Sequence, residues 1–96
     1  MEILVAYDVR TETKAGRRRL RKVGLACLAY GQRVQKSVFE CSLSPSQYVQ
    51  FEHRLLGCID QQEDQLRIYR LPVPREDYVT IYGRRDEIDL DEPLVL

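Results

Sequence analysis

The segment that most restricts the fold of this chain is the apolar stretch at residues 2–9. Successive side chains of a strand point to opposite faces of its sheet. Here both faces are apolar until Asp8 is reached. A strand with two apolar faces is typical of a sheet that is covered on both sides. We therefore expect a layer of helices against one face and a second sheet, such as one from another copy of the chain, against the other.

Two helices are predicted from the spacing of apolar residues and from capping signals. The first covers residues 14–30, with Thr13 as its N-cap and Gly31 in a left-handed conformation at its C-terminal end. The second begins after Ser44, whose hydroxyl can form a capping box with Gln47. Apolar side chains line one face of each helix, which favours packing against a sheet.

The remaining segments read as strands. Residues 32–43 are predicted to form a hairpin that turns near residues 35–37, and residues 66–71 form another strand. Residues 78–82 alternate like one further short strand. The order of elements is that of an α+β, ferredoxin-like split βαβ fold (βαββαβ) with an extra C-terminal strand.

The bulk composition indicates a globular protein. Hydrophobic residues make up 44% of the 96-residue chain and charged residues 31%, which favours a single domain over residues 1–96. We expect residues 77–96, which hold the extra strand and an acidic tail with an apolar end, to dock on a partner subunit. No apolar run approaches the roughly 20 residues of a membrane span, and the N-terminus lacks the basic start of a signal peptide. The expected location is therefore cytoplasmic, with no membrane.

The three cysteines are widely spaced and form no Cys-x-x-Cys pair. This spacing argues against a zinc site or a redox motif. We interpret Cys27, Cys41 and Cys58 as small buried apolar residues of a protein in a reducing compartment.

The charge distribution is lopsided although the net charge is +0. Residues 1–48 hold 9 Lys and Arg against 4 Asp and Glu, a net of +5, whereas residues 49–96 hold 6 against 11, a net of −5. A basic half can meet phosphate groups while the acidic half faces elsewhere. The asymmetry therefore keeps nucleic acid among the candidate partners.

Asp8 is the first candidate site residue. A carboxylate at the end of an apolar strand is costly unless it is paired or binds a cation. If two sheets pack about a two-fold axis, two copies of Asp8 could approach each other, and Mg²⁺ would relieve their repulsion. Such an ion can activate water at a phosphodiester. The alternative is that Asp8 only ends the strand and caps the following turn.

A basic cluster near the start of the first helix is the second candidate. Five of the six residues at 17–22 are Lys or Arg. Cations near a helix N-terminus oppose the helix dipole, so an anionic partner such as nucleic acid would offset the cost. The alternative is a solvated face partly neutralised by nearby acids. Arg33 and Lys36 could extend the basic patch.

Five segments of the chain, among them Tyr7-Asp8-Val9 and the segment that begins Gly31-Gln32-Arg33-Val34, resemble the CRISPR-associated protein two family. The resemblance covers essentially the whole chain, and the segment at residues 31–41 is its most specific part. The matching segments are Tyr7-Asp8-Val9, Arg19-Leu20-Arg21-Lys22-Val23, Gly31-Gln32-Arg33-Val34-Gln35-Lys36-Ser37-Val38-Phe39-Glu40-Cys41, Leu66-Arg67-Ile68-Tyr69-Arg70-Leu71 and Ile88-Asp89-Leu90-Asp91-Glu92-Pro93-Leu94-Val95.

The resemblance implies a ferredoxin-like homodimer in which Asp8 of each subunit binds a divalent metal, usually Mg²⁺, and acts in catalysis. It implies metal-dependent cleavage of single-stranded RNA or double-stranded DNA, with Arg17, Arg19 and Arg33 as nucleic-acid contacts. It also implies an antiviral role in spacer acquisition, in which the dimer bridges two CRISPR integrase dimers and holds protospacer DNA.

Three functions stay open at this point. The first is a metal-dependent endonuclease, and the second is a structural adaptor of the integrase complex that does not cleave. The third is a ferredoxin-like interaction domain with no role on nucleic acid, which would not bind nucleic acid even at low salt.

Overall fold

An antiparallel sheet of four strands, in the order β2-β3-β1-β4, forms the centre of the fold. The computed structural model describes residues 1–72 and 75–84. Strands β1 and β2 are joined through α1 but are separated in the sheet by β3, which is the arrangement of a split βαβ unit. The elements are β1 (Glu2–Asp8), α1 (Lys14–Tyr30), β2 (Gln32–Gln35), β3 (Val38–Ser42), α2 (Pro45–Cys58), β4 (Gln65–Leu71) and α3 (Arg75–Tyr78).

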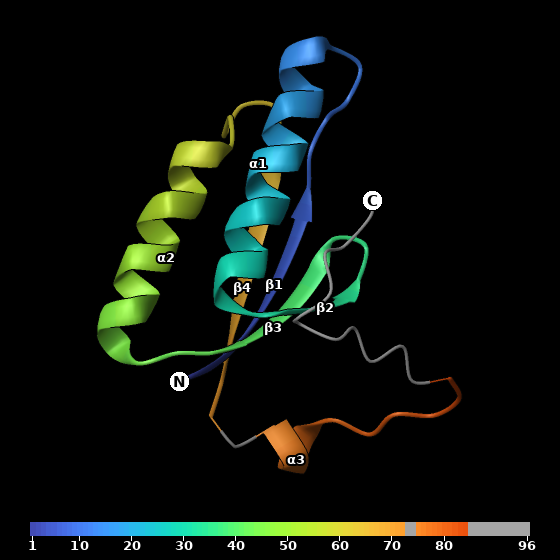
Figure 1. Ribbon diagram of the computed structural model, residues 1–96, viewed down its shortest axis with the longest axis vertical. Coiled ribbons are helices and arrows are strands. Elements are labelled where there is room, and N and C mark those ends of the chain that lie inside the picture. The colour runs from blue at the N-terminus through green and yellow to red at the C-terminus, as the bar shows by residue number, and fades with distance from the viewer. Residues whose placement is uncertain (73–74, 85–96) are drawn as a thin grey trace.

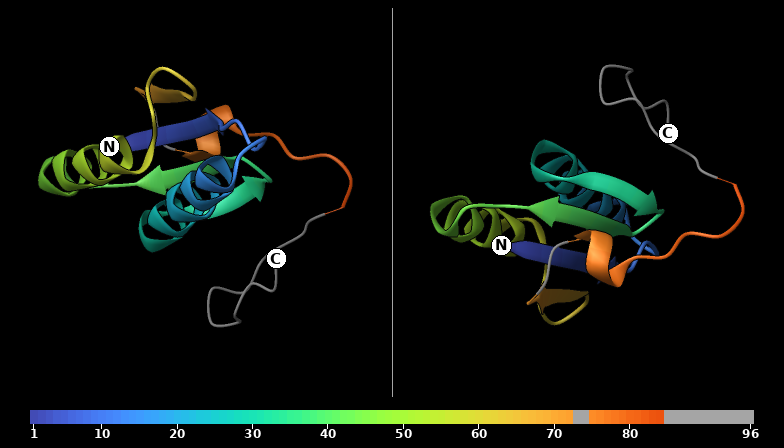
Figure 2. Two further views of the ribbon diagram at one scale, coloured as in Figure 1. Left: turned by 90° about the horizontal axis from the view of Figure 1, so that it is seen from above. Right: turned by 90° about the horizontal axis from the view of Figure 1, so that it is seen from below.

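Both long helices lie on one face of the sheet, so the fold has two layers (Figure 1). The core between the layers contains Ile3, Val5 and Tyr7 of β1, packed with Phe39 of β3 and Phe51 of α2. The α+β, ferredoxin-like fold class and the helical layer are therefore confirmed. Two views, each turned by 90° from Figure 1, show the layers from above and from below (Figure 2).

The opposite face of the sheet is uncovered by either long helix. Leu4 and Ala6 of β1 point to this side and are half-buried, and Asp8 is exposed. The short helix α3 lies beyond the lower end of the strands (Figure 1). In the part of the chain that the structure describes, the second covering layer expected from the sequence is thus not supplied by the chain itself.

The helix starts are formed by the predicted caps. The Thr13 side chain accepts a hydrogen bond from the Gly16 amide at 3.0 Å, and Ser44 and Gln47 form the reciprocal capping box. Gly31, however, has φ −157°, so the predicted left-handed conformation is wrong. The position requires glycine for a different reason. A side chain there would collide with Sγ of Cys41 and with the Glu40 carbonyl oxygen.

The predicted hairpin and fourth strand are present, with an irregularity between Arg33 and Gln35. The extra strand predicted over residues 78–82 is not formed in the chain. Tyr78 instead ends α3, and residues 79–84 belong to no strand. Alternation is a local signal, whereas a strand also needs a neighbouring edge to pair with. The acidic stretch at residues 86–92 and the apolar end at 94–96 lie outside the described residues.

The cysteines are free, as the sequence predicts. Cys27 and Cys41 are buried in the core, and Cys58 is half-buried at the end of α2. Across residues 1–72 and 75–84, no helix has the length and apolar character needed to span a membrane.

Candidate functional site: the Asp8 edge of the sheet

Asp8 is the last residue of β1 and lies directly opposite Gln65 of β4. Its side chain is exposed on the face of the sheet that the long helices leave uncovered. Among the described residues, its carboxylate has no hydrogen bond or ion pair, which does not favour the alternative that Asp8 caps the following turn. β1 points toward the end of the molecule where α1 begins, which brings Asp8 and the start of the basic helix to the same end (Figure 1).

Asp8 is the exposed carboxylate at the end of β1. Within the described residues, no group of three or more Asp, Glu, His or Cys side chains could hold a metal ion. A carboxylate oxygen is nevertheless the ligand type that Mg²⁺ prefers, and Asp8 is accessible and unpaired in that region. Asp8 is therefore a candidate ligand for a divalent cation.

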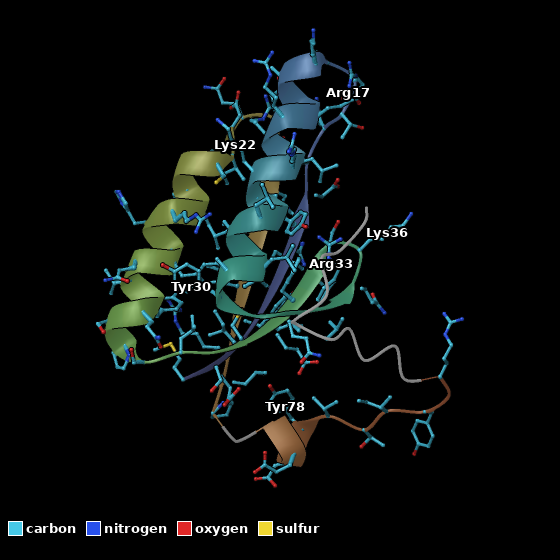
Figure 3. All side chains as sticks on the ribbon, in the orientation of Figure 1. Arg17, Lys22, Tyr30, Arg33, Lys36 and Tyr78 are labelled. Atoms are coloured by element: carbon cyan, nitrogen blue, oxygen red, sulfur yellow. The ribbon has the colours of Figure 1, made fainter. Side chains whose placement is uncertain are left out.

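In the folded chain, the basic cluster at residues 17–22 consists of an exposed group and one half-buried arginine. Arg17, Arg18, Arg21 and Lys22 are exposed on α1. Arg17 lies near the start of the helix, where its Nη1 donates to the Thr11 carbonyl oxygen at 3.1 Å (Figure 3).

Arg19 turns inward instead. Its Nε donates to Oδ2 of Asp64 at 2.8 Å and its Nη2 to Oδ1 at 3.3 Å. The Arg19 side chain is 20% exposed and that of Asp64 is 0% exposed. The hydrogen bond lowers the pKa of the Asp64 carboxyl and raises the pKa of Arg19.

Arg33 occupies a different environment, between α1 and the sheet (Figure 3). Its guanidinium carbon lies 4.9 Å from the centre of the Phe39 ring, a cation–π contact. The Arg33 Nε is buried and has no hydrogen-bond partner among the described residues. An unsatisfied buried N–H of a cation favours an anionic partner.

Tyr7 lies beside Arg33 and joins the hairpin turn to the core. Its hydroxyl donates to the Lys36 carbonyl oxygen at 3.5 Å, and its ring stacks with Phe39 at a centroid distance of 6.2 Å. Burial raises the pKa of the Tyr7 hydroxyl, so it stays protonated. Lys36 itself is exposed at the hairpin turn, so this region is basic on its outer side.

Sequence reasoning did not identify Asp64 or Arg10 as site residues. The Arg10 amide donates to Oδ1 of Asp64 at 3.2 Å, next to the Asp8–Gln65 pair. In the sequence, Asp64 falls in a polar turn with no helical or strand periodicity, so nothing local links it to Arg19. The pairing of β1 with β4 brings Arg10 to Asp64, and the position of α1 brings Arg19 to the same carboxylate.

The fold and the site define a small ferredoxin-like α+β protein with one exposed carboxylate at the end of β1 and a basic first helix. The chain belongs to the family described as CRISPR associated protein Cas2, whose model matches residues 1–81. The resemblance seen in the sequence is thereby confirmed.

Relatives and a solved structure agree with this family. A Moorella thermoacetica protein named CRISPR-associated endoribonuclease Cas2 1 is 58% identical over 96 residues, which are 100% of both chains. A Halalkalibacterium halodurans protein named CRISPR-associated endonuclease Cas2 is 45% identical over 95 residues, 99% of each chain. The crystal structure of Streptococcus pyogenes Cas2 at pH 6.5 has a TM-score of 0.75 and 51% identity, and covers 86% of this chain and 100% of that chain.

Proposed function

We propose that this protein is a homodimeric, divalent-metal-dependent endonuclease of RNA or DNA that works in CRISPR spacer acquisition. The observation that carries the proposal is the Asp8 carboxylate, which is exposed on the uncovered sheet face and unpaired within the described residues. Relatives named endoribonuclease and endonuclease support the same reaction class.

The uncovered sheet face supports the homodimer. Leu4 and Ala6 of β1 form its apolar centre. Their cross-strand neighbours are Tyr69 and Arg67 of β4 and Glu40 and Val38 of β3. Tyr69 is 45% exposed in the chain alone. Burying these side chains against a second copy removes apolar surface from water and brings the two β1 strands together.

A homodimer of this kind also completes the metal site. Asp8 from each copy would hold Mg²⁺ or another divalent cation, with water filling the remaining positions. Such an ion activates water and neutralises charge at a phosphodiester. The role of this chain's own residues is to place the two carboxylates, and to bind the phosphate backbone beside them.

Nucleic-acid binding is assigned to the exposed part of the basic surface. Arg17 is exposed on α1, and Arg33 is half-buried on β2, where it would be a second phosphate contact. Affinity for nucleic acid falls as salt rises because basic side chains neutralise phosphates. On duplex DNA, each such contact makes the slope of log affinity against log salt concentration more negative by about 0.9. Arg19 was also expected to contact nucleic acid, but its guanidinium is paired with the Asp64 carboxylate.

A second candidate function is a structural adaptor that bridges two CRISPR integrase dimers and holds protospacer DNA without cleaving it. The observation that favours this function is that, among the described residues, no group of three or more Asp, Glu, His or Cys side chains could hold a metal ion. The charge asymmetry between the two halves of the chain also suits one surface for DNA and another for protein.

The experiment compares the parent protein with Asp8→Asn on labelled double-stranded DNA and single-stranded RNA, with and without Mg²⁺. The nuclease proposal predicts Mg²⁺-dependent cutting that Asp8→Asn abolishes while salt-sensitive binding is retained. If neither protein cuts and both bind DNA and the integrase, the adaptor function is correct. Absence of binding even at low salt would contradict both functions.

A further inference from the structure

The Asp64 carboxylate is the most highly coordinated side chain at the Asp8 edge of the sheet. It is 0% exposed and accepts hydrogen bonds from Arg19 Nε at 2.8 Å and Arg19 Nη2 at 3.3 Å. It also accepts from the Arg10 amide at 3.2 Å and the Asp60 amide at 2.9 Å. Four donors from three segments of the chain therefore converge on one carboxylate.

These segments meet where β1 ends. Asp64 directly precedes β4, and its neighbour Gln65 is the cross-strand partner of Asp8. The hydrogen bond from the Arg10 amide to the Asp64 carboxylate extends the contact between β1 and β4 by two residues beyond Asp8. Figure 1 shows the connection between α2 and β4 passing behind the N-terminal half of α1. Arg19 belongs to this half of the helix.

The backbone after Asp8 is held from a second side as well. A side chain at Gly16, in the first turn of α1, would collide with the carbonyl oxygen of Arg10. The residue-10 backbone is therefore packed against α1 through its carbonyl and bonded to Asp64 through its amide. Little freedom is left for the chain on the C-terminal side of Asp8.

We propose that Asp64 and Arg19 are positioning residues for Asp8, and that Arg19 acts through Asp64 instead of contacting nucleic-acid phosphate. This inference rests on the proposed nuclease function, in which two Asp8 carboxylates must be placed accurately. The adjacent pair of Arg10 Nη1 with Glu63 Oε2, at 3.3 Å, has side chains 65% and 48% exposed. Because exposed pairs contribute little, Glu63 provides a matched control.

The first test compares Asp64→Asn with Glu63→Gln, which remove the same charge from adjacent residues. Asp64→Asn should lower kcat about 10- to 100-fold, because small displacements of a reacting group are costly, and leave KM nearly unchanged. Glu63→Gln should behave like the parent protein. Equal kcat values for the two variants, with an active parent, would overturn the proposal. If Asp64→Asn does not fold, Arg19→Lys keeps the charge but loses the two-nitrogen contact and carries the same test.

The second test separates positioning from phosphate contact. Arg17→Gln should weaken binding and reduce the salt slope by about 1, as for the loss of one phosphate contact. Arg19→Gln should lower kcat as Asp64→Asn does and leave the salt slope unchanged. The double variant Arg19→Gln/Asp64→Asn should lose no more than either single variant, because both break one interaction. A reduced salt slope in Arg19→Gln with additive effects on kcat would show that Arg19 binds phosphate.

The third test is independent of cleavage. Amide hydrogen exchange at residues 8–10 should become about tenfold faster or more in Asp64→Asn than in Glu63→Gln, because local opening becomes easier. Unchanged exchange would overturn the positioning role whatever the activity. If the parent protein cuts neither RNA nor DNA, the proposed nuclease function fails, while the exchange result still decides whether Asp64 fixes the Asp8 segment.

Discussion

Arg19 and Asp64, which are 45 residues apart in sequence, form a 2.8 Å ion pair that joins α1 to the turn before β4. The position of Arg19 in a basic helix suggests a side chain that faces solvent, but the ion pair turns this side chain inward. It leaves Arg17 and its exposed neighbours as the basic surface of α1. The contact thus divides the basic cluster into a part available to a partner and a part that organises the fold.

Stability in acid should depend on Asp64. The hydrogen bond from Arg19 holds the pKa of the folded Asp64 carboxyl below its ordinary value of 3.8. The ionised Asp64 carboxylate therefore stabilises the folded state fully above pH 3.8. This stabilisation is lost as the pH falls through the lower pKa of the folded state. Asp64→Asn should cost stability near neutral pH, and the cost should shrink below about pH 4.

The measurement is denaturant unfolding of the parent protein, Asp64→Asn and Glu63→Gln from about pH 7 down to about pH 2. The Glu63 variant controls for the loss of one negative charge. A difference between the parent protein and Asp64→Asn that stays constant over this range would contradict the assignment.

Gly31 is required by a close approach of backbone and side chain. A methyl group at this position would lie 2.5 Å from the Glu40 carbonyl oxygen and would overlap Sγ of Cys41. Gly31→Ala should therefore destabilise the protein by about 1–3 kcal/mol, the usual cost of overpacking.

Gly57 offers the matched comparison for this substitution. It lies in α2, and a methyl group there meets no atom within 4 Å. Gly57→Ala should stabilise the protein by about 0.5–1 kcal/mol because alanine favours a helix. Thermal unfolding of both variants checks the pair of predictions, and equal effects at the two positions would show that the packing around Gly31 is looser than described.

The buried thiols should be unreactive in the folded protein. Burial is the main reason why the pKa of Cys27 and of Cys41 is raised to about 12. Since the thiolate is the reactive form, alkylation near pH 8 should label Cys58 first and the other two only after unfolding. Mass spectrometry of the labelled peptides gives the order, and early labelling of Cys27 would contradict the packing between α1 and the sheet.

Local signals explain why much of the fold could be predicted. The side chains of Thr13, Ser44 and Gln47 identify the helix starts because each cap acts within three residues. Tyr78 shows where such signals are insufficient, because it alternates like a strand residue but ends α3. A strand requires a neighbouring edge, and a single sequence does not state which edge is available.

The candidate site was predicted in part. Asp8 could be selected because a carboxylate at the end of an apolar strand is unusual, and the structure places it on the uncovered face. The role of Asp64 could not be predicted, because its contacts to Arg19 and Arg10 depend on the pairing of β1 with β4. Periodicity and spacing carry no information on such long-range contacts.

The most direct test of the account is the cleavage rate of a heterodimer with one parent subunit and one Asp8→Asn subunit, isolated through two different C-terminal tags. If the two carboxylates share one metal site, replacing either should remove most of the activity that the parent homodimer shows with Mg²⁺. A heterodimer that retains half of the parental rate would mean two independent sites. A parent homodimer that cuts neither RNA nor DNA would contradict the nuclease function itself.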